Sequence, residues 1–310
     1  MNSILRKEPG KRHPVLDYEK CKRLYTVKGD ISHCINGPSD VHFLETYRKR
    51  LEFEKHPSLP TDIFVWAKGE PEEPYLTKFG GLPYLPKKIP WPLDAEGQPC
   101  IFLAQFCFID SKDIVPVPVP GGVLLIFIKH DGIDNEYLAC YEPEDIHFQW
   151  IQIGDLPIWD QQSIKANGFR SIDPTFFGVI HRTCDYEWSD EIEQKLDEAQ
   201  KKQSLYLWDT PFAHGTKIGG LPHFHQNGPP DNYGNIYHVK GRTWGDATYI
   251  AQLTSLQFSS ETPFPWCNRE KPISLDSVHR RERTFMIGDA GSIYLYLKPD
   301  GTICWFDESG

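Results

Sequence analysis

Apolar residues along the chain come mostly in short runs, and this pattern predicts a protein built largely from β-strands. Valine, isoleucine and aromatic residues dominate the runs of the first half, and Gly, Pro and Asp separate them. Runs of this length and composition are typical of strands. We therefore expect strands at 63–66, 100–109, 122–129, 137–141 and 148–153.

Two longer segments carry a helical pattern. The first, 41–55, places apolar residues on one stripe after a possible cap at Ser39 or Asp40, and we expect its basic run 48–50 to face solvent. The second, from about Asp190 to Lys202, follows the possible cap Ser189. Its apolar stripe is narrow, so we expect it to lie on the surface and to pack along one edge.

Three segments of the first half return in the same order in the second half. The matched pairs are 78–83 (KFGGLP) with 217–222 (KIGGLP), 103–106 (LAQF) with 250–253 (IAQL), and 122–132 with 291–301. An internal repeat decides an architecture before any local pattern does. It predicts an α+β protein, rich in strands and internally duplicated, whose two similar halves share one compact fold with a few peripheral helices.

The repeat also predicts how the chain is divided. Residues 1–58 have no counterpart in the second half and form an N-terminal extension with one helix. Residues 59–310 form the duplicated domain, with a first copy at 59–182, a connecting helix at 189–203 and a second copy at 205–310. The second copy is longer within 227–245 and 259–282, and we expect both insertions to be loops on the rim.

Charge and composition narrow the class of protein. The formal net charge of −10 argues against a nucleic acid or an anionic membrane as the main partner, and it is compatible with a basic protein partner. No apolar run has the length of a membrane helix, and charges interrupt the start of the chain, so we expect a cytoplasmic protein. The eight cysteines include no CxxC pair, and no cofactor is implied.

The repeated glycine loop is the strongest local motif, and it allows two interpretations. Adjacent glycines permit a close approach of the backbone, so the loop can cradle a small ligand or an anion beside a lysine. The simpler interpretation is a tight turn where the halves pack. The candidate residues are Lys78, Gly80 and Gly81 in the first copy and Lys217, Gly219 and Gly220 in the second.

Two glutamines and one tryptophan are further candidates. Gln105 and Gln252 occupy equivalent positions inside apolar strands, where an amide requires several hydrogen-bond partners. Those partners can be backbone groups of the glycine loop or a ligand in a cleft between the halves. Trp91, in a Pro-Trp-Pro turn found only in the first copy, can anchor a partner or cover the end of the core.

Histidines give the candidate metal site. His223 and His225 follow the second glycine loop, and an HxH pair on a strand puts both imidazoles on one face. His214 is near in sequence, whereas the first copy has no histidine at these positions. The neighbours His181 and Cys184 do not form a recognised nucleophile motif, so no catalytic residue is assigned.

Taken together, the glycine loop, the Pro-Trp-Pro turn, 102–105 and the strand at 122 resemble the YwqG-like family, also called DUF1963. The resemblance runs from about residue 63 to the C-terminus. It implies an α+β protein of two similar β-rich halves, and it supplies no reaction, cofactor or catalytic residue. Members of the family are associated with toxin–antitoxin and immunity-type gene neighbourhoods.

We therefore expect a non-enzymatic protein-binding module, for example an immunity protein or an antitoxin, whose partner is a toxin or another protein with a basic surface. The alternative is a small-ligand-binding protein or an enzyme that uses a cleft between the two halves.

Overall fold

The computed structural model describes most of the chain. The described residues are 4–25, 35, 37–129, 139–140, 146–154, 156–173, 175–203, 210–226, 228, 243–256, 266–267, 285–288 and 290–309. The Asp131-Gly132 pair, whose sequence predicts a hairpin-type turn after the strand at 122–129, lies outside these residues, as do most of the loop 227–245 and nearly all of the loop 259–282.

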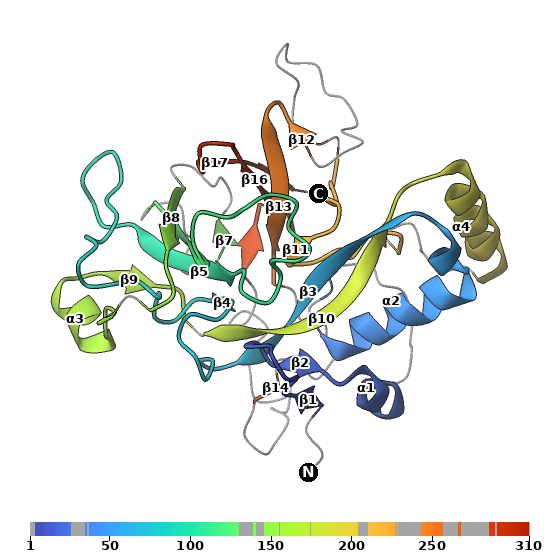
Figure 1. Cartoon of the computed structure of the whole chain (residues 1–310), viewed down its shortest axis with the longest axis horizontal. Helices are drawn as coiled ribbons and strands as arrows, with labels where there is room; N and C mark the ends of the chain where they lie inside the picture. Colours follow the sequence, from blue (N-terminus) through green and yellow to red (C-terminus); the bar gives the residue numbers. More distant parts are fainter. Residues whose placement is uncertain are drawn as a thin grey trace.

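A long antiparallel sheet organises the fold (Figure 1). Its strand order is β17-β16-β13-β11-β3-β10-β4-β5-β6-β8. The bounds are β3 Ser58–Lys68, β4 Lys78–Phe79, β5 Ile101–Cys107, β6 Val123–Ile128, β8 His147–Ile151, β10 Phe176–Tyr186, β11 Lys217–Gly219, β13 Ala247–Thr254, β16 Ser292–Leu297 and β17 Ile303–Glu308.

Short strands extend this sheet at several points. They are β1 (Leu5–Arg6) on β2 (Val15–Leu16), β2 also on β10, β9 (Arg170–Ser171) on β5, β12 (Thr243–Trp244) on β13 and β14 (Trp266–Cys267) on β3. A separate pair joins β7 (Ala139–Cys140) to β15 (Met286–Ile287). The β-rich α+β class predicted from the sequence is confirmed.

Strands β3 and β10 form the centre of the sheet, and each neighbours a strand from the other end of the sequence. Val65 lies opposite Val179 in their register. Strand β11 meets β3 with Lys217 opposite Ile63, and β4 meets β10 with Lys78 opposite Phe177. The lysine that begins each glycine loop thus lies opposite equivalent positions of the two central strands: Ile63 is two residues before Val65, and Phe177 is two residues before Val179.

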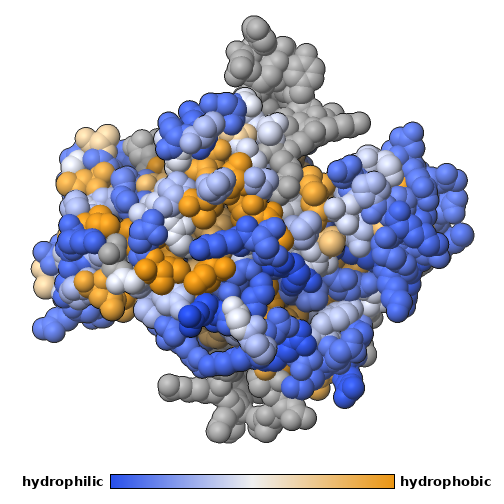
Figure 2. All heavy atoms as spheres, in the orientation of Figure 1, coloured by the Kyte–Doolittle hydropathy of each residue, from blue (hydrophilic) through white to orange (hydrophobic). Residues whose placement is uncertain are grey.

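The helices lie around the sheet (Figure 1). They are α1 (Tyr18–Leu24), α2 (Pro38–Arg50), the 3-10 turn η1 (Phe53–Lys55), α3 (Gln161–Ala166) and α4 (Asp190–Gln203). Helix α1 was not predicted, and the stretch predicted at 41–55 divides into α2 and η1. The face seen in Figure 2 is hydrophilic over α4, and its apolar residues gather toward the middle and left.

Helix α4 confirms the pattern predicted for it. The Ser189 hydroxyl accepts a hydrogen bond from the Ile192 amide (3.3 Å), as the predicted cap requires. Ile192, Leu196 and Ala199 are all buried, and they pack against residues of α2 and η1. The narrow stripe thus fixes α4 along one edge of the molecule.

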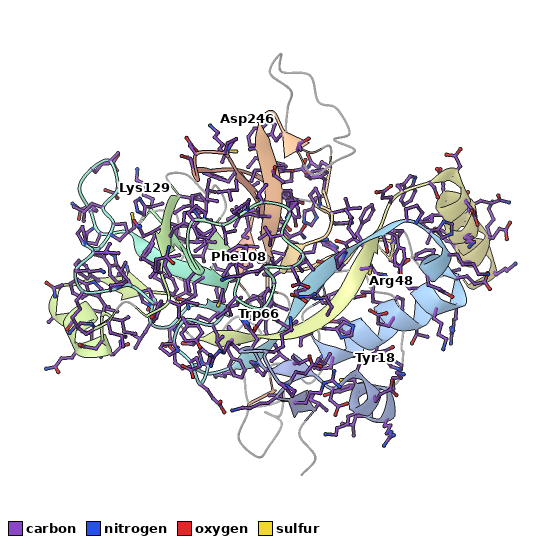
Figure 3. All side chains as sticks on the ribbon, in the orientation of Figure 1. Tyr18, Arg48, Trp66, Phe108, Lys129 and Asp246 are labelled. Atoms are coloured by element: carbon purple, nitrogen blue, oxygen red, sulfur yellow. The ribbon has the colours of Figure 1, made fainter. Side chains whose placement is uncertain are left out.

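The prediction that residues 48–50 face solvent is wrong for Arg48 (labelled in Figure 3). Its side chain is buried, and its guanidinium donates to the carbonyl oxygens of Thr210 (2.6 Å) and Pro211 (3.0 Å). Both acceptors lie far along the chain, so the helix could not indicate this contact. Arg48 therefore fixes α2 to the segment that leads into the second glycine loop.

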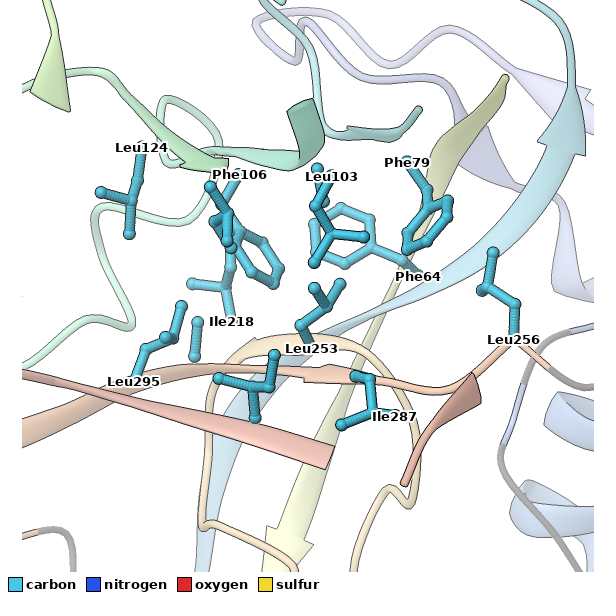
Figure 4. Packing of buried hydrophobic residues seen from close by; sticks show 14 of the residues in the cluster. Phe64, Phe79, Leu103, Phe106, Leu124, Ile218, Leu253, Leu256, Ile287 and Leu295 are labelled. Atoms are coloured by element: carbon cyan, nitrogen blue, oxygen red, sulfur yellow. The ribbon is translucent and has the colours of Figure 1, made fainter. Parts of the chain in front are cut away.

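The centre of the sheet is buried on both faces because alternate residues of β3 enter two different cores. Phe64 and Trp66 belong to the largest hydrophobic cluster, whereas Val65 packs with residues of α1 and α2. On either side of the central strands β3 and β10, the sheet has two wings: β4, β5, β6 and β8 form the first wing, and β11, β13, β16 and β17 form the second. In Figure 4, Leu103 and Leu124 of the first wing face Leu253 and Leu295 of the second wing across this largest cluster. The two wings therefore close over a shared core.

Candidate functional site

Each glycine loop encloses a carboxylate of the protein itself. In the first loop Lys78 Nζ contacts Glu70 Oε2 (2.7 Å), and the Leu82 amide donates to Glu70 Oε1 (3.0 Å). In the second loop Lys217 Nζ contacts Asp185 Oδ2 (2.8 Å), and the Leu221 amide donates to the same oxygen (2.8 Å). Both loops are therefore anion cradles whose anion is internal.

The paired glycines leave the room for these carboxylates. Gly81 and Gly220 both have positive φ values, +70° and +67°. A Cβ atom at Gly81 would lie 2.1 Å from Glu70 Oε1, and one at Gly220 would lie 2.1 Å from Asp185 Oδ2. The loop is visible in the sequence, whereas neither acidic partner was predicted from it.

The two cradles differ in their exposure to solvent. The side chains of Lys217 and Asp185 are both 0% exposed, whereas the side chain of Glu70 beside the buried Lys78 is 44% exposed. Burial lowers the pKa of both lysines, and the adjacent carboxylate opposes that shift in each. The second cradle is thus a dry ion pair, and the first is open on its carboxylate side.

The two strand glutamines support these loops through matching contacts. Gln105 Oε1 accepts from the Tyr84 amide (2.9 Å), and Gln252 Oε1 accepts from the His223 amide (3.1 Å). Their amide groups donate to backbone carbonyls, Gln105 to Pro74 and Leu76 and Gln252 to Gly215. These contacts join each glutamine to the backbone beside its glycine loop, which is one of the two kinds of partner considered from the sequence.

Trp91 is buried rather than presented at the surface. Its indole Nε1 donates to the Cys100 carbonyl oxygen (2.7 Å), and its ring stacks on Phe169 with centroids 4.7 Å apart. This tryptophan covers the outer core of the first wing. An exposed anchor for a partner is not available at this position.

A buried polar contact that the sequence did not indicate ties the N-terminal extension to the sheet. His13 Nδ1 contacts Asp110 Oδ2 (2.8 Å), and the Thr77 amide donates to His13 Nε2 (3.0 Å). Because the Thr77 amide is a donor, Nε2 accepts and Nδ1 is the ring nitrogen that donates to Asp110. These side chains are buried, and their hydrogen bonds hold the N-terminal extension against the sheet; we refer to this contact as the His13 lock.

The histidines after the second loop form a cluster with His214. The ring centroids of His214 lie 4.2 Å from His223 and 4.9 Å from His225, and those of His223 and His225 lie 6.1 Å apart. In the described part of the chain, no three His, Cys, Asp or Glu side chains are already arranged to hold a metal ion. The cluster is nevertheless the densest group of imidazoles among the candidates from the sequence.

A groove of about 390 Å³ lies at the junction of the two wings. One wall is the segment 117–120 (VPVP), and the other includes Leu297 and the turn 298–301. Asp246, at the turn between β12 and β13 (labelled in Figure 3), lies on the rim of the groove.

Among the helices that the structure describes, none combines the length and apolar character needed to cross a membrane.

Comparison with known proteins agrees with the motifs. A search of curated proteins finds no match. A family defined by a domain of unknown function, DUF1963, matches residues 77–302, a stretch that contains both glycine loops, both strand glutamines and the histidine cluster. The match covers well over half of the 310 residues. The chain therefore belongs to the DUF1963 family.

Proposed function

We propose that this protein is a non-enzymatic, cytoplasmic protein-binding module, and that the groove between its two wings receives an extended segment of a partner. The groove itself is the observation that carries the proposal. Its apolar wall contains Val117 and Val119, which are half-buried, and the buried Leu297. Apolar side chains of a partner can be buried there.

The distribution of polar groups favours a protein segment over a small molecule. Small-molecule sites hold a few buried polar groups that fix the orientation of the ligand. Here the charged groups Asp246, Lys298 and Asp300 are exposed on the rim. A polar rim around an apolar centre is typical of protein interfaces.

Charge favours a basic partner. The net charge of −10 provides a long-range attraction for a cationic surface, and Asp246 and Asp300 add two carboxylates at the groove. A toxin neutralised by this protein is one partner of that kind. The alternative of a ligand held by the glycine loops has less support, because their lysines already pair with Glu70 and Asp185.

Affinity capture from the native host tests this function with three baits. The double variant Asp246→Lys/Pro299→Lys replaces a carboxylate and a proline on the rim with two cations, and Glu54→Lys reverses an exposed charge on η1 as the control. We expect wild type and control to recover the same stoichiometric partner and the double variant to lose it. Failure to recover any partner, or its retention by the double variant, would refute the proposal.

We further propose that the two halves are copies of one ancestral unit. In support, the Gly178 amide donates to the Thr77 carbonyl oxygen (2.9 Å), and the Phe64 amide donates in the same way to Thr216 (3.0 Å). These contacts make β10 the counterpart of β3, so this proposal counts β10 with the second copy instead of the first copy at 59–182. An experimental structure in which residues 58–151 fail to superpose on 176–308, strand for strand, would contradict a common origin.

A further inference from the structure

We propose that His214, His223 and His225 bind a divalent transition-metal ion of the zinc class. The cluster is built from two stretches, one on each side of β11, which the sheet holds in place. His214 and His223 are buried, and His225 is half-buried. This site is separate from the groove, and its proposal does not depend on the function proposed above.

The spacing of the rings fits three ligands of one ion. A zinc-bound imidazole nitrogen lies ~2.0–2.1 Å from the metal, which places ring centroids roughly 5 Å apart around a tetrahedral centre. The observed separations of 4.2, 4.9 and 6.1 Å bracket that value. The three rings are not aimed at one point in the structure, so binding requires rotation about their side-chain torsions.

A chain of hydroxyl groups orients one of the rings. His225 Nε2 contacts Ser292 Oγ (3.1 Å), and Ser292 Oγ donates to Thr254 Oγ1 (2.9 Å). Metal-bound histidines commonly use their second ring nitrogen in this way, which fixes the tautomer and the ring plane. Nδ1 of His225 is then the nitrogen that would bind the ion.

In the first half of the chain, aromatic rings other than imidazoles occupy the corresponding positions. Counted from the loop lysines Lys78 and Lys217, the positions of His214 and His223 correspond to Tyr75 and Tyr84. The two tyrosine rings pack edge to face with centroids 5.8 Å apart. Packing alone is therefore satisfied without metal-binding side chains, and the histidines of the second half add a chemistry that the fold does not need.

Zinc titration of the purified full-length protein, with a chromophoric zinc indicator as competitor, tests the site. We expect one equivalent of Zn²⁺ to bind with a Kd of about 1 μM or tighter. Substitution of Co²⁺ should give the visible absorption of a tetrahedral site with nitrogen ligands. The variant His214→Tyr/His223→Tyr inserts the residues of the first half, and we expect it to bind at least about 100-fold more weakly.

Two further variants make the result decisive. His225→Ala removes a half-buried ligand and serves if the double variant does not fold, as judged by far-UV circular dichroism in EDTA. His42→Gln, on α2, controls for adventitious binding to a histidine outside the cluster and should bind as wild type does. Absence of saturable binding to wild type, or unchanged affinity in the folded cluster variants, would overturn the proposal.

Discussion

The two lysine cradles predict unequal costs for the same substitution. Lys217 and Lys78 occupy corresponding positions in their loops, and each side chain is buried against a carboxylate. Methionine is one atom shorter than lysine; it replaces the apolar stem with one of similar shape and removes the charge. Lys217→Met and Lys78→Met are therefore matched variants that differ in the exposure of the carboxylate left behind.

The magnitude follows from that exposure. Without Lys217, the carboxylate of Asp185 stays at 0% exposure, keeps the amides of Ala213 and Leu221 as hydrogen-bond donors, and has the guanidinium of Arg48, 3.9 Å away, as its remaining cation, which places the expected loss at the lower end of the range for a broken buried pair. Removal of one partner from a buried pair costs about 3–5 kcal/mol. Without Lys78, water can reach Glu70, and an exposed pair contributes about 0–1 kcal/mol.

Urea denaturation at pH 7, followed by far-UV circular dichroism, measures both free energies of unfolding. We expect Lys217→Met to lose at least about 2 kcal/mol more than Lys78→Met. Equal losses for the two single variants would refute the reasoning from exposure.

Three further predictions concern other contacts. Gly97 has positive φ and open space around it, so Gly97→Ala should lower the free energy of unfolding by about 1 kcal/mol. Gly220→Ala should lower it by at least about 3 kcal/mol, because the new Cβ atom meets Asp185. Equal losses for the two variants in urea denaturation would contradict this. His13→Ala should cost about 2–3 kcal/mol and accelerate hydrogen exchange in residues 4–16, and unchanged exchange would exclude the proposed lock. Burial opposes ionisation of Glu45, but His181, Arg48 and Thr183 outweigh it and lower its pKa to about 2. Glu45 therefore stabilises the fold fully above about pH 4.5 and loses this effect as pH falls toward 2, so Glu45→Gln should flatten that part of the stability profile.

The repeat made a large part of the framework predictable. Equivalent residues in equivalent strands have equivalent backbone partners, as the contacts of Gln105 and Gln252 demonstrate. The strands at 63–66, 100–109, 122–129 and 148–153 also appear, because short β-branched and aromatic runs fit a sheet buried on both faces.

The acidic partners could not be predicted in the same way. Glu70 lies 8 residues before Lys78, whereas Asp185 lies 32 residues before Lys217, so no common spacing marks them. Glu70 comes just after β3 and Asp185 lies near the end of β10, so the position of both carboxylates depends on how these central strands are placed in the sheet. Arg48 was missed for a related reason, since its acceptors are carbonyl groups more than 160 residues away.

The candidate metal site was visible only in part. The HxH spacing at His223 and His225 is local and can be found in the sequence. The third imidazole, His214, precedes β11, and the two other histidines follow it; the fold brings the segments on both sides of this strand into contact. Sequence proximity suggested this residue, and only the fold gives the ring separations.

Each central strand neighbours a strand of the other half of the sequence, β3 with β11 and β10 with β4, and this arrangement also governs when the chain can fold during translation. Strand β4 has β10 as a neighbour, and β3 pairs with β10 over 11 residues, so both edges stay open until residues 176–186 have left the ribosome. Strand β11 must follow before β3 is covered on its other side. A nascent chain that stops between the halves therefore exposes unpaired central strands, which favours aggregation over a stable half-protein.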